Sequence, residues 1–281
     1  MVLGGQVDFS VLMCVYGGDR GGPFIDAYES VLAQSRLPNE VVLVIDGPIP
    51  KAILQGVKDF QSRLAHLEIE FVLVSLSSNV GHGRARAKGI QKCTRKYVAI
   101  VDADDINHKD RFIRQVDFLA KNPQVHIVGS QVREVDEETR KEICIKRVPC
   151  AHSEIISFMK YRCPFNQMSV MFSRERVLSA GNYLDFYHNE DYYLWIRMYL
   201  KGAVFANLED VLVDARVNLG FYLRRGGIRY FASEARLQWT LYRTGMTPLH
   251  LLLAGVFFRF ILQVLAPPRV RGAIFRKFFR D

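Results

Sequence analysis

The stretch YVAIVDADDINHKDR, residues 97–111, joins an apolar run to three carboxylates within four residues. Its first half is β-branched and continuously apolar, which is typical of a buried strand. Asp102, Asp104 and Asp105 follow where that strand would end, and like charges there repel one another and are costly to dehydrate. A cation, a set of hydrogen-bond donors or open water must therefore meet this charge.

Short apolar runs of the same kind recur through the first half of the chain and alternate with segments of helical spacing. The predicted strands are 9–16, 40–46, 69–75 and 97–102. The predicted helices are 23–34, 51–64, 83–93 and 109–121. This alternation predicts an α/β fold with a parallel sheet covered on both faces. Ligands of such sheets gather beyond the carboxyl ends of the strands, where Tyr16, Asp46 and Asp102 fall.

The composition fits one large globular core with some sequence left for an appendage, because 49% of the 281 residues are hydrophobic and 24% are charged. The five cysteines are odd in number and scattered, and the N-terminus has no signal-like apolar core. Both features favour a reducing, cytosolic setting. Cys144, Cys150, His152 and Cys163 lack a C-x2-C pair, so buried thiols are favoured over a zinc site.

The formal net charge of +9 is unevenly distributed along the chain. Residues 243–281 contain seven Lys and Arg against one Asp, a net of +6, and the rest of the chain is close to balanced. A basic body would favour nucleic acid, whereas a basic and apolar tail favours anionic lipid headgroups. We therefore expect an anionic membrane surface as a partner and no nucleic acid.

A dinucleotide-binding fold is the first alternative to test. The segment YGGDRGGP (16–23) does not spell G-x-G-x-x-G, and the chain contains no G-x4-G-K-[ST] loop. Because these cofactor signatures are missing, the acidic strand ends need another explanation.

Four motifs in order resemble the GT-A fold glycosyltransferases of family 2. They are VIDG with Asp46, NVGHGRARAKG (79–89), DADD (102–105) and NEDYYLW (189–195). PFNQMSVMF (164–172) and FYLRRGG (221–227) are most similar to enzymes of bacterial exopolysaccharide and O-antigen synthesis, of the amylovoran type. The resemblance implies a GT-A domain over residues 1–230, with a mostly parallel central sheet flanked by helices. A C-terminal helical, membrane-associating region would follow over residues 231–281.

The resemblance also implies a site for a nucleotide sugar, with a UDP-sugar as the favoured donor. In the family, D-x-D binds a divalent metal at the diphosphate, which assigns Asp104 to Mn2+ or Mg2+ and Asp102 to the nucleotide or sugar. Asp46 would meet the base, Tyr16 would lie beside the nucleotide, and Arg86 would face the phosphates or their linked aspartates.

On the acceptor side, inversion needs a carboxylate that removes the proton of the attacking hydroxyl, and Asp191 is the candidate. Glu190 would position it, Asn166 could bind an acceptor hydroxyl, and Arg224 with Arg225 could bind phosphate. Glu190 and Asp191 would lie in the first turn of a helix. An apolar stripe would hold this helix on the sheet, made of Leu194, Trp195 and Met198.

Simpler interpretations of the same residues exist. Asp105 and Asn107 could cap a helix that starts near His108, and Asp46 could serve only its D-G-P turn. Glu190 and Asp191 could be ordinary acids at a helix N-terminus. Arg224 and Arg225 could form an exposed basic turn.

The C-terminal run LHLLLAGVFFRFILQVLA (249–266) is interrupted by Arg259 and followed by Pro267 and Pro268. A membrane span needs about 20 mostly apolar residues, and a central arginine costs roughly 2.5–3.5 kcal/mol. We therefore expect a pair of amphipathic helices, 249–266 and the basic 269–281, on the cytoplasmic face of the inner membrane. A cap packed on the domain or a partner subunit, or a single span, are the alternatives.

The expected activity is transfer of a sugar from a nucleoside-diphosphate sugar to a hydroxyl of a lipid-linked glycan, in bacterial cell-surface polysaccharide synthesis. Two other classes remain open. A metal-dependent nucleotidyltransferase shares the sheet topology, although its G-x-G-T-R-like start is absent here. A non-catalytic membrane scaffold could retain the fold.

Overall fold

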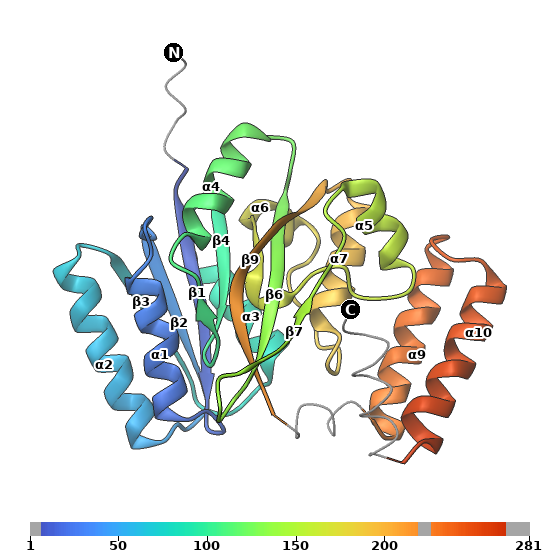
Figure 1. The fold of residues 1–281 in the computed structure, drawn as a ribbon, viewed down its shortest axis with the longest axis horizontal. Helices are drawn as coiled ribbons and strands as arrows, with labels where there is room; N and C mark the ends of the chain where they lie inside the picture. The colour runs from blue at the N-terminus through green and yellow to red at the C-terminus, as the bar shows by residue number, and fades with distance from the viewer. Residues whose placement is uncertain (1–6, 219–225, 268–281) are drawn as a thin grey trace.

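The computed structural model describes residues 7–218 and 226–267, which form a mixed sheet with helices on both faces (Figure 1). The strands are β1 (Phe9–Tyr16), β2 (Glu40–Asp46), β3 (Glu70–Leu76), β4 (Tyr97–Asp102), β5 (Ile106–Asn107), β6 (Ile127–Asp136), β7 (Glu142–Lys146), β8 (Met171–Ser173) and β9 (Phe205–Val217). The helices are α1 (Gly21–Leu32), α2 (Lys51–His66), α3 (His82–Lys92), α4 (Arg111–Lys121), α5 (His152–Met159), α6 (Arg174–Ser179), α7 (Glu190–Leu200), α9 (Ile228–Arg243) and α10 (Leu249–Phe260), with the short turns η1 (Gln167–Ser169) and η2 (Ile261–Leu265). The four predicted strands and four predicted helices of the first half are confirmed within a few residues.

The strand order is β3-β2-β1-β4-β8-β6-β9-β5, and β7 pairs with β6. Six strands, β1 to β4 with β6 and β9, run in one direction, because the antiparallel β8 separates two parallel blocks. The expected mostly parallel α/β sheet is therefore confirmed. The register pairs Tyr16 with Asp46 and Cys14 with Asp102, so the predicted strand ends meet at one edge.

Alternating side chains of the strands build one apolar layer on each face of the sheet. On β1, Val11 and Met13 join the layer under α1, α2 and α4, whereas Leu12 points to the layer under α3 and α7. The sheet is not covered evenly, since β3 is an edge strand whose Leu73 is exposed. The expectation that every early strand is buried on both faces is wrong for β3, which has a neighbouring strand on one side only.

The predicted stripe on α7 is buried, because Leu194, Trp195 and Met198 are all fully inaccessible to solvent. Leu237 and Leu241 of α9 belong to the same apolar cluster as Trp195. The predicted domain boundary at residue 230 falls inside α9. We propose that α9 belongs to the body of the protein and that the C-terminal region begins after it.

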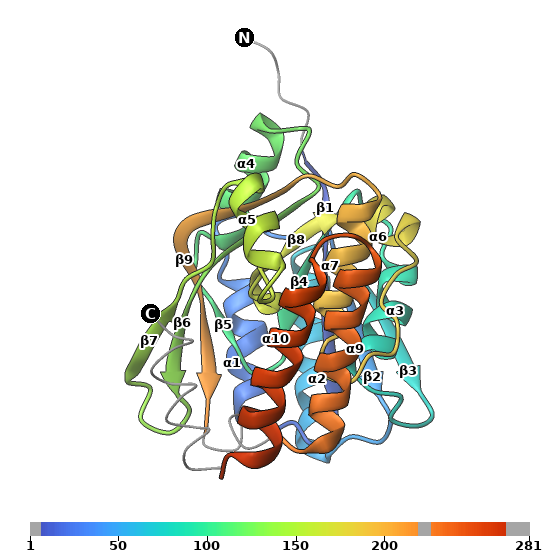
Figure 2. The same cartoon turned by 90° about the vertical axis from the view of Figure 1, so that its right-hand side faces the viewer.

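Helices α9 and α10 form an antiparallel hairpin at one end of the molecule (Figure 2). Arg259 of α10 donates from Nε to Glu234 Oε2 of α9 at 2.8 Å, and its Nη2 donates to the Tyr161 carbonyl at 2.9 Å. Helix α10 is thereby fixed to α9 and to the segment that follows α5.

Candidate active site

The three acids after β4 have different surroundings. The Asp102 side chain is 27% exposed and Asp104 is exposed, whereas Asp105 is buried and its Oδ1 accepts from the Arg216 backbone N–H at 2.9 Å. Burial, reinforced by Asp104 and Asp102, raises the pKa of Asp105 well above its ordinary value. Two carboxylates are thus presented to solvent while the third ties the loop to β9.

The helix-capping interpretation does not describe these side chains. Helix α4 begins at Arg111, and the side chain of its N-cap residue, Asp110, makes no capping hydrogen bond; the Phe112 N–H of the first turn donates to Gln34 Oε1 at 3.1 Å instead. Asn107 instead donates from Nδ2 to Ser30 Oγ at 2.9 Å. Asp105 and Asn107 therefore fix the loop between β4 and α4 rather than the end of the helix.

Arg86 is a buried cation between the two halves of the site. Its Nη2 donates to Asp102 Oδ1 at 2.9 Å, and its Nη1 donates to Glu190 Oε1 at 3.0 Å. Burial alone would lower the pKa of Arg86, but Asp102 and Glu190 raise it above its ordinary value. One guanidinium therefore connects the carboxyl end of β4 to the first turn of α7, and it faces a linked aspartate as the sequence predicted.

Asp46 anchors the loop that leads into α3. Its Oδ1 accepts from Val80 N–H at 2.7 Å and its Oδ2 accepts from Gly81 N–H at 3.0 Å. Gly81 has φ +89°, a conformation that favours glycine. The carboxylate is buried beside Tyr16, and it holds the start of α3 in addition to lying in a D-G-P turn. The Tyr16 ring is partly exposed and packs edge-on against His82, with 5.7 Å between ring centroids.

Glycine at position 83 lets α3 approach α7 closely. A Cβ at Gly83 would lie 3.1 Å from the Glu190 Cβ and 3.1 Å from the Leu184 carbonyl oxygen. Such contacts are tighter than side chains ordinarily make, so a larger residue would require Glu190 or the backbone at Leu184 to shift by a few tenths of an ångström.

Asp191 lies half-buried in the first turn of α7. Burial, with Glu190 adding to it, raises the pKa of Asp191 to about 6, against the opposing effects of the Tyr192 N–H, Arg86 and Lys146. A carboxylate with a pKa near 6 is suited to accept a proton near neutral pH. The local environment therefore fits the predicted base better than an ordinary solvated acid.

Asn166 is only 1% exposed, and its amide nitrogen donates to the carbonyls of Ser130 at 3.0 Å and Lys146 at 3.3 Å. Its Oδ1 has no hydrogen-bond partner among the described residues. Asn166 therefore joins β6 to β7, and only this oxygen is left for the predicted contact with an acceptor. Arg224 and Arg225 lie outside the described residues.

Two charged residues near the site were not predicted from the sequence. Asp19 follows β1, and its Oδ2 accepts from Tyr16 N–H at 2.9 Å. Burial, together with Asp104 and Asp102, raises the pKa of Asp19 to about 7. The rule that ligands gather at strand ends could have identified Asp19, whereas Lys146, whose charge acts on Asp191, follows no such pattern.

Arg111 is fully buried beneath the acidic loop, and it was also missed. Its Nη2 donates to the carbonyls of Ile100 at 2.8 Å and Val170 at 3.3 Å, and its Nη1 donates to Asn107. Burial lowers the pKa of Arg111 to about 9, while Asp102 and Asp105 oppose that change. An arginine in the first turn of a helix is normally a surface residue, so the sequence carries no signal for this position.

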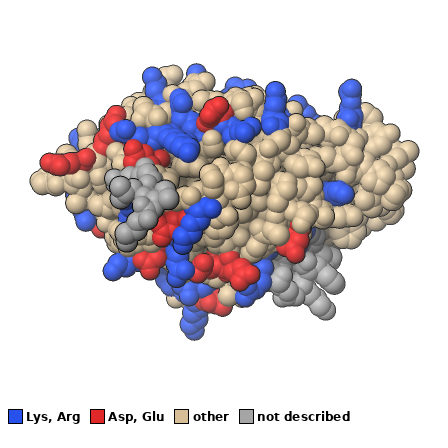
Figure 3. Space-filling model, turned by 90° about the horizontal axis from the view of Figure 1, so that it is seen from above, with Lys and Arg blue, Asp and Glu red and all other residues tan. Residues whose placement is uncertain are grey.

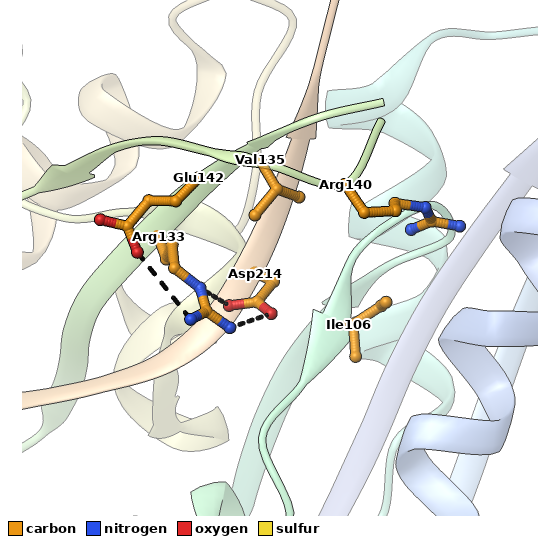
Figure 4. Close-up of a pocket in the computed structure, with 6 residues that line it drawn as sticks. All are labelled: Ile106, Arg133, Val135, Arg140, Glu142 and Asp214. Atoms are coloured by element: carbon orange, nitrogen blue, oxygen red, sulfur yellow. Dashed lines mark hydrogen bonds and ion pairs between the residues drawn. The ribbon is translucent and has the colours of Figure 1, made fainter. Parts of the chain in front are cut away.

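A cavity of about 240 Å³ lies between β5 and the strands β6, β7 and β9. Figure 4 shows that Arg133 crosses it to Asp214, with 2.8 Å from Nε to Oδ1 and 2.6 Å from Nη2 to Oδ2. The other lining residues are Ile106, Val135, Arg140 and Glu142. None of the predicted site residues lines this cavity, and the ion pair of Arg133 with Asp214 joins β6 to β9.

The residues after β4 suit a hard divalent cation. Within residues 7–218 and 226–267, no three His, Cys, Asp or Glu side chains are grouped to hold a metal by themselves. Asp102 and Asp104 nevertheless offer carboxylate oxygens at a solvent-facing strand end, and these are the ligands that Mg2+ and Mn2+ prefer. A nucleotide-bound metal needs few protein ligands, because diphosphate oxygens and water complete its coordination.

Comparisons with known proteins agree with this arrangement. The profile of Glycosyl transferase family 2 matches residues 10–181. The amylovoran biosynthesis glycosyltransferase AmsE of Erwinia amylovora is 35% identical over 84% of this chain and 88% of its own length. The UDP-Gal:alpha-D-GlcNAc-diphosphoundecaprenol beta-1,3-galactosyltransferase of Escherichia coli is 34% identical over 97% of this chain and 96% of its own length.

Two solved structures share the fold. TarS (residues 1–349) of S. aureus in complex with UDP-GlcNAc has a TM-score of 0.66 and 16% identity, over 91% of this chain and 73% of that chain. The mannosyltransferase PcManGT of Pyrobaculum calidifontis, in complex with GDP-Man and Mn2+, has a TM-score of 0.63 and 17% identity, over 96% of this chain and 78% of that chain. With its D-x-D loop, buried Arg86 and acidic α7 arranged on a GT-A-like sheet, this chain belongs to glycosyltransferase family 2.

Proposed function

We propose that the protein is an inverting glycosyltransferase that moves a sugar from a nucleoside-diphosphate sugar, most simply a UDP-sugar, to a hydroxyl of a lipid-linked glycan. The observation that carries this proposal is the bridge that Arg86 makes between Asp102 and Glu190, 2.9 and 3.0 Å away. The bridge places the predicted donor loop beside the helix turn that holds the predicted base.

On the donor side, Tyr16 and Asp46 at adjacent strand ends would contact the base and ribose, and Asp102 would contact the ribose or sugar. Mn2+ or Mg2+ would be held by Asp104, with Asp102 nearby, and when bound it supplies positive charge to stabilise the departing diphosphate. Arg86 holds Asp102 in place and adds a buried positive charge beside it.

On the acceptor side, Asp191 takes the proton of the attacking hydroxyl as its oxygen bonds to the anomeric carbon. The bond between that carbon and the diphosphate oxygen breaks, and the nucleoside diphosphate leaves from the opposite face. Glu190 is held by Arg86 and, as a neighbouring negative charge, favours protonation of Asp191. This environment supports the proposed base.

The acceptor class is supported by the relatives. One is named for amylovoran synthesis, and another for transfer to GlcNAc-diphosphoundecaprenol. We propose the same broad class, a lipid-linked glycan of bacterial surface polysaccharide synthesis, for this chain. Arg224 and Arg225 remain our candidates for its phosphate, and Asn166 Oδ1 for a hydroxyl.

Attachment to an anionic membrane surface is supported by the outer face of the C-terminal hairpin. Leu253 and Phe257 of α10 are 61% and 66% exposed. Other large apolar residues exposed on α10 and η2 are Leu249, Phe258, Phe260, Ile261 and Leu265. In Figure 3 the end of the molecule that carries the hairpin shows little charge. A surface helix normally turns polar residues outward, so this face needs an apolar partner.

Arg259 strengthens this interpretation in a way that the sequence did not predict. Its guanidinium turns inward to Glu234, so it does not interrupt the outer apolar face. The chain then continues with Arg269, Arg271, Arg276, Lys277 and Arg280, a charge that complements anionic headgroups better than it suits a second copy of this basic protein.

The alternative of a cap packed on the domain is supported in part, because Leu252 of α10 and Leu262 of η2 are buried. The second predicted amphipathic helix, 269–281, lies outside the described residues. Across the two described ranges, no helix has the length and apolarity that crossing a bilayer requires. From the exposed apolar face of α10 and the basic sequence that follows it, we propose a peripheral location on the cytoplasmic face of the inner membrane.

The decisive experiment incubates the protein with UDP-sugars, Mn2+ and a GlcNAc-diphospho-lipid acceptor. Glycosyl transfer releases free nucleoside diphosphate, whereas the alternative nucleotidyltransferase would release pyrophosphate. A scaffold would release neither and would not bind UDP. Transfer without inversion at the anomeric carbon would contradict the single-base mechanism.

A further inference from the structure

The turn that leads into the proposed base has an unusual backbone. His188 is a non-glycine residue in the left-handed region, with φ +57°, two residues before Glu190. Asn189 then occupies the N-cap of α7, but its side chain makes no capping hydrogen bond. A turn of this kind persists only where neighbouring structure holds it, so its supports bear directly on the position of Asp191.

Helix α9 supplies those supports from one face. The Ser233 hydroxyl donates to the Tyr187 carbonyl at 2.5 Å and accepts from Asn189 Nδ2 at 3.2 Å. The Asn189 amide is therefore engaged by α9 instead of capping its own helix. Both Ser233 and Asn189 are buried, which excludes water as an easy substitute for either bond.

Two cation–π contacts from α9 hold the same turn at further points. The Arg229 guanidinium lies 4.2 Å from the Tyr187 ring centroid, and that of Arg236 lies 4.7 Å from the Phe186 ring centroid. Positions 229, 233 and 236 recur at helical spacing, so they share one face of α9. Another side of α9 contacts α10, through the ion pair of Glu234 with Arg259.

We propose that this face of α9 is a clamp that holds residues 186–189 and so positions Asp191, with Ser233 as the central positioning residue. Ser233 touches no reacting group in the proposed mechanism. It acts by fixing the N-cap of α7, from which Asp191 is two residues away. This inference rests on the proposed function, in which Asp191 is the base.

The test compares Ser233→Ala with Ser233→Thr and Thr240→Ala, measuring kcat and the KM for UDP-sugar. Ser233→Ala should lower kcat by about 10- to 100-fold, because displacements near 1 Å can cost about that much, with KM changed less than about twofold. Ser233→Thr retains the hydroxyl and should recover most of kcat. Thr240→Ala is the matched control, since within the described part of the chain the Thr240 hydroxyl bonds only to the Arg236 carbonyl of its own helix, and it should leave kcat unchanged.

Because Ser233 is buried, Arg229→Met provides a second variant at an exposed position, and it should lower kcat severalfold with an unchanged melting temperature. If Ser233→Ala and Arg229→Met both keep the parent kcat while Asp191→Asn is inactive, the clamp is refuted and the proposed base stands. If Asp191→Asn is itself active, Asp191 is not the base, and this result contradicts the proposed function independently of the clamp. A fall in kcat that Ser233→Thr does not recover would also overturn the positioning role.

Discussion

Arg86 on α3 donates a hydrogen bond of 3.0 Å from Nη1 to Glu190 Oε1 at the start of α7. These residues are 104 positions apart in the sequence, and their contact joins α3 to the first turn of α7. Its geometry depends on a planar guanidinium that can serve two carboxylates at once.

Replacing Arg86 with lysine should therefore lower kcat/KM by about 10- to 100-fold, because a single ammonium cannot reach Asp102 and Glu190 together and one charged hydrogen bond is worth about 1.5–3 kcal/mol. Release of nucleoside diphosphate measures the effect. Arg84→Lys is the matched control, since Arg84 lies on the same helix but pairs with Asp185 in solvent. Equal activity of the two variants would mean that the bridge has no catalytic importance.

Removal of metal with EDTA should stop transfer, and Mn2+ or Mg2+ should restore it. Asp104→Asn should remain inactive after metal is returned while keeping the parent melting temperature, because Asp104 is exposed. Asp110→Asn, a change at a nearby exposed acid, should retain activity. A fully active Asp104→Asn enzyme in metal-depleted buffer resupplied with Mg2+ would rule out the metal assignment.

The rate should rise with pH through about 6. Burial and Glu190 raise the pKa of Asp191 to about 6, with Arg86, Lys146 and the Tyr192 N–H opposing, and the base must be unprotonated to act. At pH 5 kcat should therefore be about one tenth of its plateau, and above pH 7 it should be nearly constant. A flat profile from pH 5 to 8, with chemistry rate-limiting, would contradict this protonation state.

Substituting both Leu253 and Phe257 with glutamine should weaken binding to vesicles that contain phosphatidylglycerol by about 10- to 100-fold, because each lost apolar contact is worth roughly 1 kcal/mol or more. Sedimentation with vesicles measures the loss. Leu54→Gln, at an exposed leucine on α2, is the control and should bind normally. High salt should weaken the parent protein only partly, since it screens the basic tail but not the apolar face. If the double variant sediments as strongly as the parent protein, the exposed face of α10 is not the membrane contact.

Much of this site could be predicted from local sequence, because strand periodicity and motif order placed Asp46, Asp102 and Asp104 at one edge of a parallel sheet. The bridge from Arg86 to a linked aspartate also followed from its motif. The supports could not be predicted in the same way. Asp105 is held by a backbone N–H 111 residues away, and Arg111 looks like an exposed helix residue although it is fully buried.

The same limit explains why the contacts of Asn166 and of Arg259 in the hairpin could not be predicted. Nothing local indicates that the Asn166 amide would bond to two strands, or that Arg259 would turn inward to Glu234. Both arrangements depend on which elements become neighbours when the chain folds. Side-chain chemistry was therefore easier to predict than the direction in which a polar side chain points.

In the proposed mechanism, Asp191 removes the proton from the acceptor hydroxyl. The most direct measurement compares Asp191→Asn with the parent enzyme, using kcat for transfer and the dissociation constant for UDP with Mn2+. We expect kcat to fall by about 10²- to 10⁴-fold, because the amide cannot accept the proton, while UDP binding is unchanged. Turnover close to that of the parent, with normal UDP binding, would contradict the assignment of Asp191 as the base.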